Sequence, residues 1–193
     1  MDGDRRMTPE DSLDIIGRFM SQTRHTVLRD SYMPFLVWGW TTVIVALVVY
    51  AGVHFCADRR FYLVWFAIPV IGTPLVVRLQ PGRNRVRTTV AKSLHSVWMM
   101  LTVLLVGFSA TSFFVPYNVL FAVLMLLSIG CYVTGVLISY PVLQGSSYVG
   151  FGTAILLWVV GGTAQILIFA AAIAAMMIIP GYMMKKSLDD ERA

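Results

Sequence analysis

A dense group of basic residues is the strongest chemical feature of this sequence. The polar stretch from Gln80 to Lys92 reads QPGRNRVRTTVAK, and the cations in it and just before it are Arg78, Arg83, Arg85, Arg87 and Lys92. Apolar stretches of membrane-spanning length lie on both sides. Such a cluster marks the cytoplasmic face of a bilayer, because anionic lipid attracts it and its translocation is unfavourable. We predict that these five residues contact lipid headgroups or a protein partner.

The other ionisable residues do not form a catalytic set. All 10 Asp and Glu residues fall near the termini or at Asp58, outside the middle of every apolar stretch. Ion-coupled transporters use an intramembrane ionisable group, and intramembrane enzymes need a nucleophile with a base or a metal with its ligands. An enzyme would need interfacial groups, such as His95 with Arg87 and Lys92. The sequence therefore predicts no enzyme and no cofactor.

The histidines and cysteines also lack a binding pattern. His54 and His95 are predicted near opposite faces of the membrane, so each is an interfacial polar residue rather than a metal ligand. Cys56 lies near the end of its span and Cys131 well inside another, about 15–20 Å apart in depth by helical rise. That separation is too large for a disulfide.

Composition places most of the chain in lipid. The 193 residues are 58% hydrophobic and 13% charged, whereas soluble domains carry about 25% charged residues. The net charge of +5 fits orientation and lipid-headgroup charges better than a nucleic-acid partner. The expected class is an all-α integral membrane bundle.

Residues 1–33 are predicted to form a cytoplasmic module with an amphipathic helix over 9–31. Thr8 and Pro9 suit a helix start. The apolar residues that recur at helical spacing are Leu13, Ile16, Phe19, Met20, Val27 and Leu28. This stripe either lies on the inner leaflet or the bundle, or docks a cytoplasmic partner or a second copy. Without a cleavage signal, the first span acts as an uncleaved anchor.

Six spans follow in a domain over residues 34–184. They are expected at about 34–56, 61–79, 94–114, 119–139, 146–161 and 165–184, with a cytoplasmic tail over 185–193. Pro69 and Pro74 should bend the second span. A turn at 161–163, Gly-Gly-Thr, should separate the last two spans and leave Gln165 near the exterior end.

Charge asymmetry orients this arrangement. With six spans, 13 of the 15 Lys and Arg residues lie on the cytoplasmic side, and only Arg59 and Arg60 lie on the exterior side. A five-span alternative would place Lys185 and Lys186 outside, against the bias. We therefore predict a multipass protein of the bacterial inner membrane with both termini in the cytoplasm.

Hydroxyl and amide side chains occur within the spans and have two interpretations. They either bond carbonyls of their own or a neighbouring helix, or line a path for a small neutral solute. Gly130 with Thr134, and the alanines near residue 172, favour close helix packing. The polar residues are Thr41, Thr42, Thr73, Thr102, Ser109, Thr111, Ser112, Ser128, Thr134 and Gln165.

Several short segments resemble a known group of proteins. They are PFLVWGW at 34–40, WFAIP at 65–69 and IPGY at 179–182, together with the N-terminal amphipathic helix. This combination resembles small multipass inner-membrane proteins from Bacteroidota. The resemblance implies the architecture and the inner-membrane location, and no activity or functional residue is carried over from it.

The leading functional hypothesis is a non-enzymatic membrane protein that binds or regulates a partner at its cytoplasmic face. The expected partners are the bilayer, anionic lipid headgroups and a cytoplasmic protein bound through residues 9–31, with no nucleic acid. The alternative is a small permease or channel for a neutral or lipidic substrate, for which oligomerisation would matter because six short helices enclose little room. A homo-oligomer stays open in both cases.

Overall fold

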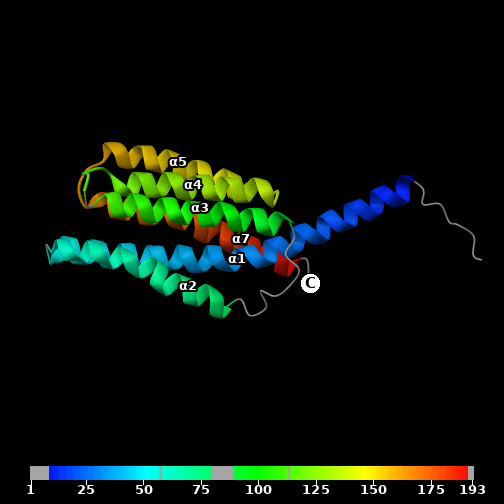
Figure 1. The fold of residues 1–193 in the computed structure, drawn as a ribbon, viewed down its shortest axis with the longest axis horizontal. Helices are drawn as coiled ribbons and strands as arrows, with labels where there is room; N and C mark the ends of the chain where they lie inside the picture. Colours follow the sequence, from blue (N-terminus) through cyan, green and yellow to red (C-terminus); the bar gives the residue numbers. More distant parts are fainter. Residues whose placement is uncertain (1–8, 57, 80–88, 113, 191–193) are drawn as a thin grey trace, which may run out of the picture.

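The computed structural model describes residues 9–56, 58–79, 89–112 and 114–190, with the backbone alone over 9–30 and at Arg59. All regular structure in these residues is helical (Figure 1). The elements are α1 (Pro9–Phe55), the 3₁₀ helix η1 (Arg59–Phe66), α2 (Ala67–Leu79), α3 (Thr89–Thr111), α4 (Val119–Leu137), α5 (Pro141–Val159), α6 (Ala164–Ile173), the π-helical η2 (Ala174–Ile178) and α7 (Ile179–Asp190).

Six stretches are long and apolar enough to cross a membrane, which confirms the predicted all-α architecture of a multipass membrane protein. They are Ser31–Phe55, Arg60–Leu79, Thr89–Thr111, Val119–Leu137, Pro141–Val159 and Ala164–Asp190. The second joins η1 to α2, and the last joins α6, η2 and α7.

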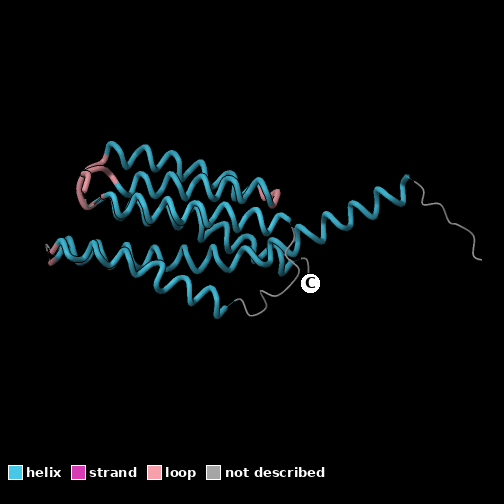
Figure 2. The backbone as a smooth tube through the Cα atoms, in the orientation of Figure 1, coloured by secondary structure: helices cyan, strands magenta, loops and turns pink. Residues whose placement is uncertain are grey.

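The spans run alternately up and down, so the bundle has two distinct ends (Figure 2). We name the turn end after the three connections at 56–58, 112–118 and 160–163. We name the basic end after Arg78, Lys92, Lys185 and Lys186, which lie at the end of α2, the start of α3 and in α7. The α4–α5 connection and the end of α7 also lie there.

The last span is the central helix of the bundle. It packs against α1 on one side and against the α4–α5 pair on the other. Its apolar window is 56% buried, whereas the windows of the spans ending in α2 and α3 are each 6% buried. α2 packs on α1 and α3 packs on α4, so these two helices form the periphery. A helix that is apolar on all sides, as α6 is, suits the central position.

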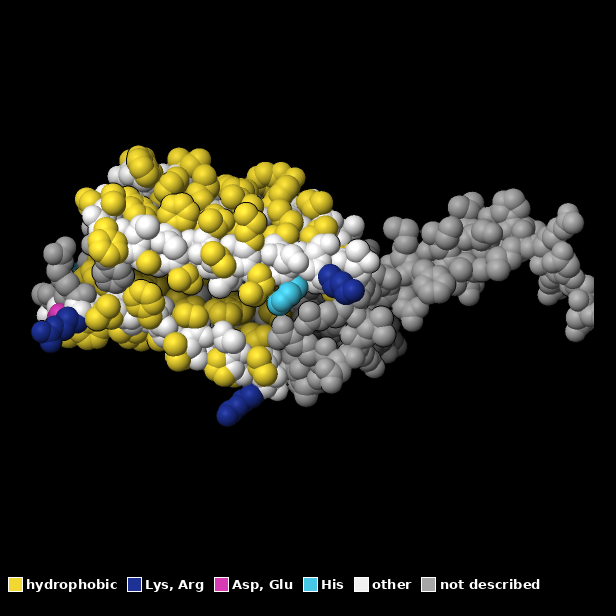
Figure 3. Space-filling view, in the orientation of Figure 1, with side chains coloured by type: hydrophobic (Ala, Val, Ile, Leu, Met, Phe, Trp, Pro, Cys, Tyr) yellow, Lys and Arg dark blue, Asp and Glu magenta, His cyan; other side chains and the backbone are white. Residues whose placement is uncertain are grey.

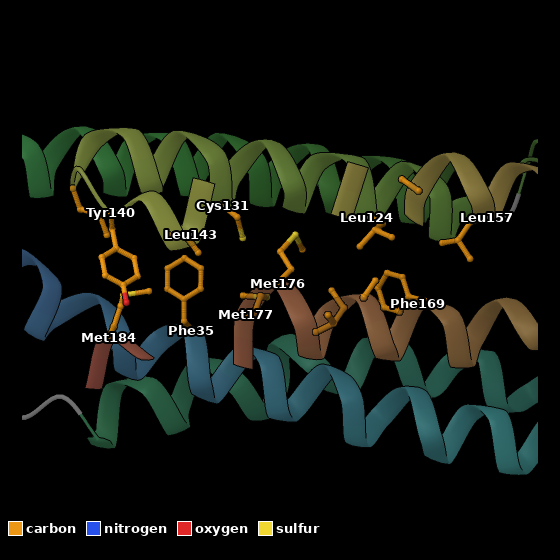
Figure 4. Packing of buried hydrophobic residues seen from close by; sticks show 14 of the residues in the cluster. Phe35, Leu124, Cys131, Tyr140, Leu143, Leu157, Phe169, Met176, Met177 and Met184 are labelled. Carbon is orange, nitrogen blue, oxygen red and sulfur yellow. The ribbon is translucent and has the colours of Figure 1, made fainter. Parts of the chain in front are cut away.

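The main core lies between the central helix and the α4–α5 pair (Figure 4). Phe169, Met176 and Met184 from the last span face Leu124, Cys131, Leu143 and Leu157 from α4 and α5. Phe35 of α1 completes this layer. A second cluster near the turn end joins α1 and α6, and its buried members are Val45, Ala46, Val49, Ile166 and Ala170.

The N-terminal segment differs from the prediction, because it is not a separate helix. α1 is one helix of 47 residues that continues through Pro34. A proline removes one intrahelical hydrogen bond, and membrane helices tolerate that loss where neighbouring helices and small local adjustments satisfy the freed backbone group. No glycine or turn sequence stands between residues 24 and 33 to end the helix.

Several helix ends also differ from those expected. α3 begins at Thr89 rather than near 94, so Lys92 is helical rather than part of a loop. α5 begins at Pro141 rather than near 146, because proline suits the first helical position. The last span continues past Pro180 to Asp190 rather than ending near 184.

Other local predictions are confirmed. The last two spans separate at 160–163, and Gly162 has a φ of 78°, which favours glycine. Pro69 lies in the first turn of α2, where η1 changes to an α-helix, and Pro74 lies inside α2, which diverges from α1 toward the basic end (Figure 1). Gln165 lies at the turn end, in the first turn of α6.

Candidate functional site: the basic end of the bundle

The two described cations of the predicted site lie on different helices toward the same end of the bundle. Arg78 lies in the last turn of α2 and Lys92 in the first turn of α3, and both side chains are exposed. Lys185 and Lys186 of α7 are also exposed at this end. On the face shown in Figure 3, Lys and Arg lie at the margins of the described body and hydrophobic side chains cover most of the area between them. Arg83, Arg85 and Arg87 lie outside the described residues.

At the same end, α1 extends well beyond the bundle. Ser31, the first residue of α1 whose side chain the structure describes, is 7% exposed. Residues 9–30 continue the helix away from it (Figure 1), for about 33 Å at 1.5 Å per residue. The predicted apolar stripe therefore belongs to a segment that is not folded back on the bundle.

Hydroxyl groups of α3, α4 and α5 bond carbonyls of their own helices. Ser128, Thr134 and Ser147 are fully buried at 0% exposure. Hydroxyls that donate to the carbonyl four residues earlier, at 2.6 to 2.8 Å, are those of Thr102, Ser109, Ser128, Thr134 and Thr153. Among the described residues no buried side-chain N or O lacks a hydrogen-bond partner. This geometry matches the packing interpretation of these residues.

Close helix contacts at glycines support the same interpretation. A Cβ added at any of seven glycines would lie 2.1 to 2.9 Å from a neighbouring side chain, and these are Gly39, Gly52, Gly72, Gly130, Gly135, Gly150 and Gly181. Gly130 and Thr134 form the expected close contact: Leu101 and Trp98 of α3 lie against Gly130, and Trp98 Nε1 donates to Thr134 Oγ1 at 3.1 Å.

A polar contact at the centre of the bundle was not predicted from the sequence. Pro180 has no N–H, so it cannot donate to the Met176 carbonyl four residues earlier. The chain winds there as the π segment η2, and the Ile179 N–H donates to the Ala174 carbonyl. Ser146 Oγ of α5 lies 3.4 Å from the Met176 carbonyl oxygen, and Ser128 Oγ of α4 lies 3.4 Å from Met176 Sδ. The feature of the sequence that could have indicated this irregular helix is Pro180, a proline inside a long apolar run.

Asn118 joins three helices at the turn end, which sequence reasoning also missed. Its Oδ1 caps α4 by accepting from the Phe121 N–H at 3.1 Å. Its Nδ2 donates to the Leu157 carbonyl at 2.6 Å and to Gln165 Oε1 at 3.2 Å. Gln165 in turn donates to the Val160 carbonyl. An asparagine just before an apolar run was the signal for the cap.

The histidines and cysteines lie as expected. His54 is near the turn end of α1, where its ring stacks on that of Tyr50 with the centroids 5.3 Å apart. His95 is near the basic end, in α3. Cys56 is exposed and Cys131 is buried, and both are free thiols. In the part of the chain that the structure describes, no three His, Cys, Asp or Glu side chains come together as metal ligands.

These features describe a packed, apolar bundle with a polar and basic end from which one helix projects. No family model, no curated protein and no solved structure matches this chain. The resemblance to inner-membrane proteins of Bacteroidota therefore stays a prediction.

Proposed function

We propose that this protein is a non-enzymatic, multipass component of the bacterial inner membrane that binds a partner protein at the cytoplasmic face. The observation that carries the proposal is the projecting helix over residues 9–30. It bears an apolar stripe at helical spacing. In helix-in-groove recognition, an amphipathic helix places its apolar face in a hydrophobic groove of the partner, and a helix that projects from its own protein is available for this.

The orientation in this proposal follows from charge. The projecting helix, Arg78, Lys92, Lys185 and Lys186 all belong to the basic end, and Arg60 lies at the other end. Basic residues beside spans are retained on the cytoplasmic side. Both termini are then cytoplasmic, and the stripe faces cytoplasmic proteins.

The permease alternative has less support. It needs hydroxyl groups that line a path, yet Ser128, Thr134 and Ser147 are fully buried and bond carbonyls. The close approach at Gly150, where an added Cβ would lie 2.2 Å from Ser128 Oγ, leaves no free space at that point.

The test is site-specific photo-crosslinking in cells. Helical periodicity places Met20 in the centre of the stripe and Gln22 on the opposite side of the helix. A crosslinking amino acid at Met20 should form one discrete adduct, and the same group at Gln22 should form none. In a matched pair, Met20→Glu should reduce capture of that partner at least about tenfold, because a charge in an apolar interface costs more than about 1.4 kcal/mol. Gln22→Glu should leave capture unchanged.

The mass of the adduct identifies the partner class. An adduct with a different protein supports the proposal, and an adduct of twice the mass of the chain replaces it with self-association. Absence of any adduct at Met20, or equal adducts at both positions, would refute the docking role, and solute flux in reconstituted vesicles would then be measured.

A further inference from the structure

Two of the three connections at the turn end combine exposed apolar side chains with a lack of charge. No Asp, Glu, Lys or Arg occurs at 112–118 or at 160–163. Phe114 in the first connection is 87% exposed, and Val159, directly before the second, is 79% exposed. Trp158 is exposed beside it. Exposed apolar side chains gathered in this way mark a surface that contacts lipid or another protein.

The connection between α1 and η1 differs in charge and in position. Asp58 and Arg60 are exposed there, and Asp58 Oδ1 accepts a hydrogen bond from the Arg60 N–H at 2.8 Å. Figure 2 shows that the end of α1 and the start of η1 lie farther out along the bundle than the loops that join α3 to α4 and α5 to α6. The charged connection therefore reaches a level that the two uncharged connections do not reach.

Helix length explains this difference in level. α4 and α5 have 19 residues each, and each is about 28 Å long at 1.5 Å per residue. The hydrocarbon core of a bilayer is about 30 Å thick. The membrane-spanning part of α1, Ser31–Phe55, has 25 residues and is about 37 Å long by the same rise. α1 is long enough to bring its turn end into water, whereas α4 and α5 are too short to bring both of their ends into water.

Side chains satisfy the backbone carbonyls at the end of α5. The last carbonyls of a helix have no partner within it and bond water where water is present. Here Asn118 Nδ2 donates to the Leu157 carbonyl at 2.6 Å, and Gln165 Nε2 donates to the Val160 carbonyl. These groups therefore need no water.

The end of α3 is satisfied in the same way. Ser112 Oγ donates to the Ser109 carbonyl at 2.7 Å. The Phe108 carbonyl accepts from the Tyr117 O–H, and also from Thr111 Oγ1 at 3.0 Å. Backbone groups must find partners within the protein where water is scarce. Both uncharged connections are thus equipped for a position below the water boundary.

We propose that residues 114–118 and 160–163 lie at the boundary between headgroups and acyl chains of the leaflet at the turn end, with Phe114, Trp158 and Val159 in contact with acyl chains. Aromatic side chains favour this depth. Only the α1–η1 connection then reaches the aqueous phase at this end. The placement depends on the transmembrane fold and is independent of any partner at the basic end.

A protein partner fits this surface less well than lipid. A protein interface has a polar rim and about 10 direct hydrogen bonds. The two connections carry no charge, and the side chains of Tyr117, Asn118 and Gln165 already bond carbonyls of their own chain. The exposed side chains beside them are apolar, and acyl chains adapt to such a surface, so the occupant is lipid.

Electron paramagnetic resonance of nitroxide labels tests this depth. The full chain is reconstituted in phosphatidylcholine vesicles with one label, at Phe114→Cys or Val159→Cys in a Cys56→Ser background, or at native Cys56 as the aqueous reference. Collisions with oxygen, which concentrates among acyl chains, are compared with collisions with a water-soluble nickel chelate present on both sides. The ratio of oxygen to nickel collisions should be higher at residues 114 and 159 than at Cys56.

Gly152→Cys in the same background provides the lipid reference. It lies seven residues before Val159 on α5, about 10 Å deeper by helical rise, and nothing lies within 4 Å of a Cβ added there. The ratio at residue 159 should fall between those at residues 152 and 56. Circular dichroism and gel filtration check that each labelled variant folds, and residues 114 and 159 each test the proposal if the other variant does not fold.

Two results would overturn the proposal. Collisions with the nickel chelate at residues 114 and 159 that match those at Cys56 would place both connections in water. Few collisions with either reagent at these residues would show that protein covers the patch. A raised ratio at 114 and 159, with frequent oxygen collisions, supports contact with acyl chains.

Discussion

Gly150 shows how single residues set the packing of this bundle. It lies in α5 where α4 and the π segment meet, and an added Cβ would lie 2.2 Å from Ser128 Oγ and 2.6 Å from Met176 Sδ. Both neighbours are fully buried. We expect Gly150→Ala to destabilise the protein by about 1–3 kcal/mol, as overpacking does. Thermal unfolding in detergent, followed by intrinsic fluorescence, should show a lower midpoint.

Gly152 provides the matched control on the same helix. Nothing lies within 4 Å of a Cβ added there, so Gly152→Ala should keep or raise the midpoint. Removing the closest atom should restore part of the loss, so Gly150→Ala with Ser128→Ala should unfold at a higher temperature than Gly150→Ala alone. If both alanine variants behave alike, the three helices do not meet as described.

The α4–α5 connection illustrates how the ends of elements are specified. Ser139 has a φ of 52°, a left-handed conformation that glycine adopts most easily. Its N–H donates to the Val136 carbonyl at 3.1 Å, and the Tyr140 N–H donates to the Gly135 carbonyl at 2.8 Å. These two bonds form a Schellman motif. We expect Ser139→Gly to stabilise the protein by about 1 kcal/mol, measured by denaturant or thermal unfolding.

Ser139→Val tests the same element in the opposite direction. A β-branched side chain is unfavourable at positive φ, so this variant should unfold below the parent protein. A parent-like midpoint for both substitutions would contradict the left-handed turn. This connection was expected to cover about residues 140–145, and the motif explains its short length: it ends α4 just before Pro141, which begins α5.

At the scale of the whole molecule, the two cysteines report orientation. Cys56 is exposed at the turn end, and Cys131 is fully buried between helices. With the basic end in the cytoplasm, Cys56 should react with a membrane-impermeant thiol reagent in intact cells. Cys131 should react from neither face. Labelling is read by mass shift, with Cys56→Ser as the control that abolishes it.

Reaction of Cys56 only after membrane disruption would show that the protein has the opposite orientation in the membrane. The projecting helix would then face the exterior, and the proposed cytoplasmic partner would be wrong. Reaction of Cys131 in the native protein would instead contradict the packed core, because that thiol is enclosed by the core between the central helix and the α4–α5 pair.

The sequence by itself determined the six apolar spans and the break between the last two, which it placed at 161–163. These features depend on local composition: an apolar run must be about 20 residues long to cross a bilayer, and Gly162 adopts the positive φ of the turn without help from distant residues. Gln165 was placed correctly for the same reason, because it directly follows the turn.

Only the tertiary structure decided which helix is central, that α1 continues past Pro34, and that α2 and α3 are peripheral. Lipid is as apolar as a helix face, so hydropathy alone does not separate buried sides from lipid-facing sides. Gly150 and Gly152 are identical in sequence terms, yet only Gly150 meets Ser128 and Met176. That difference arises from the close approach of helices distant in the chain, which local patterns do not encode.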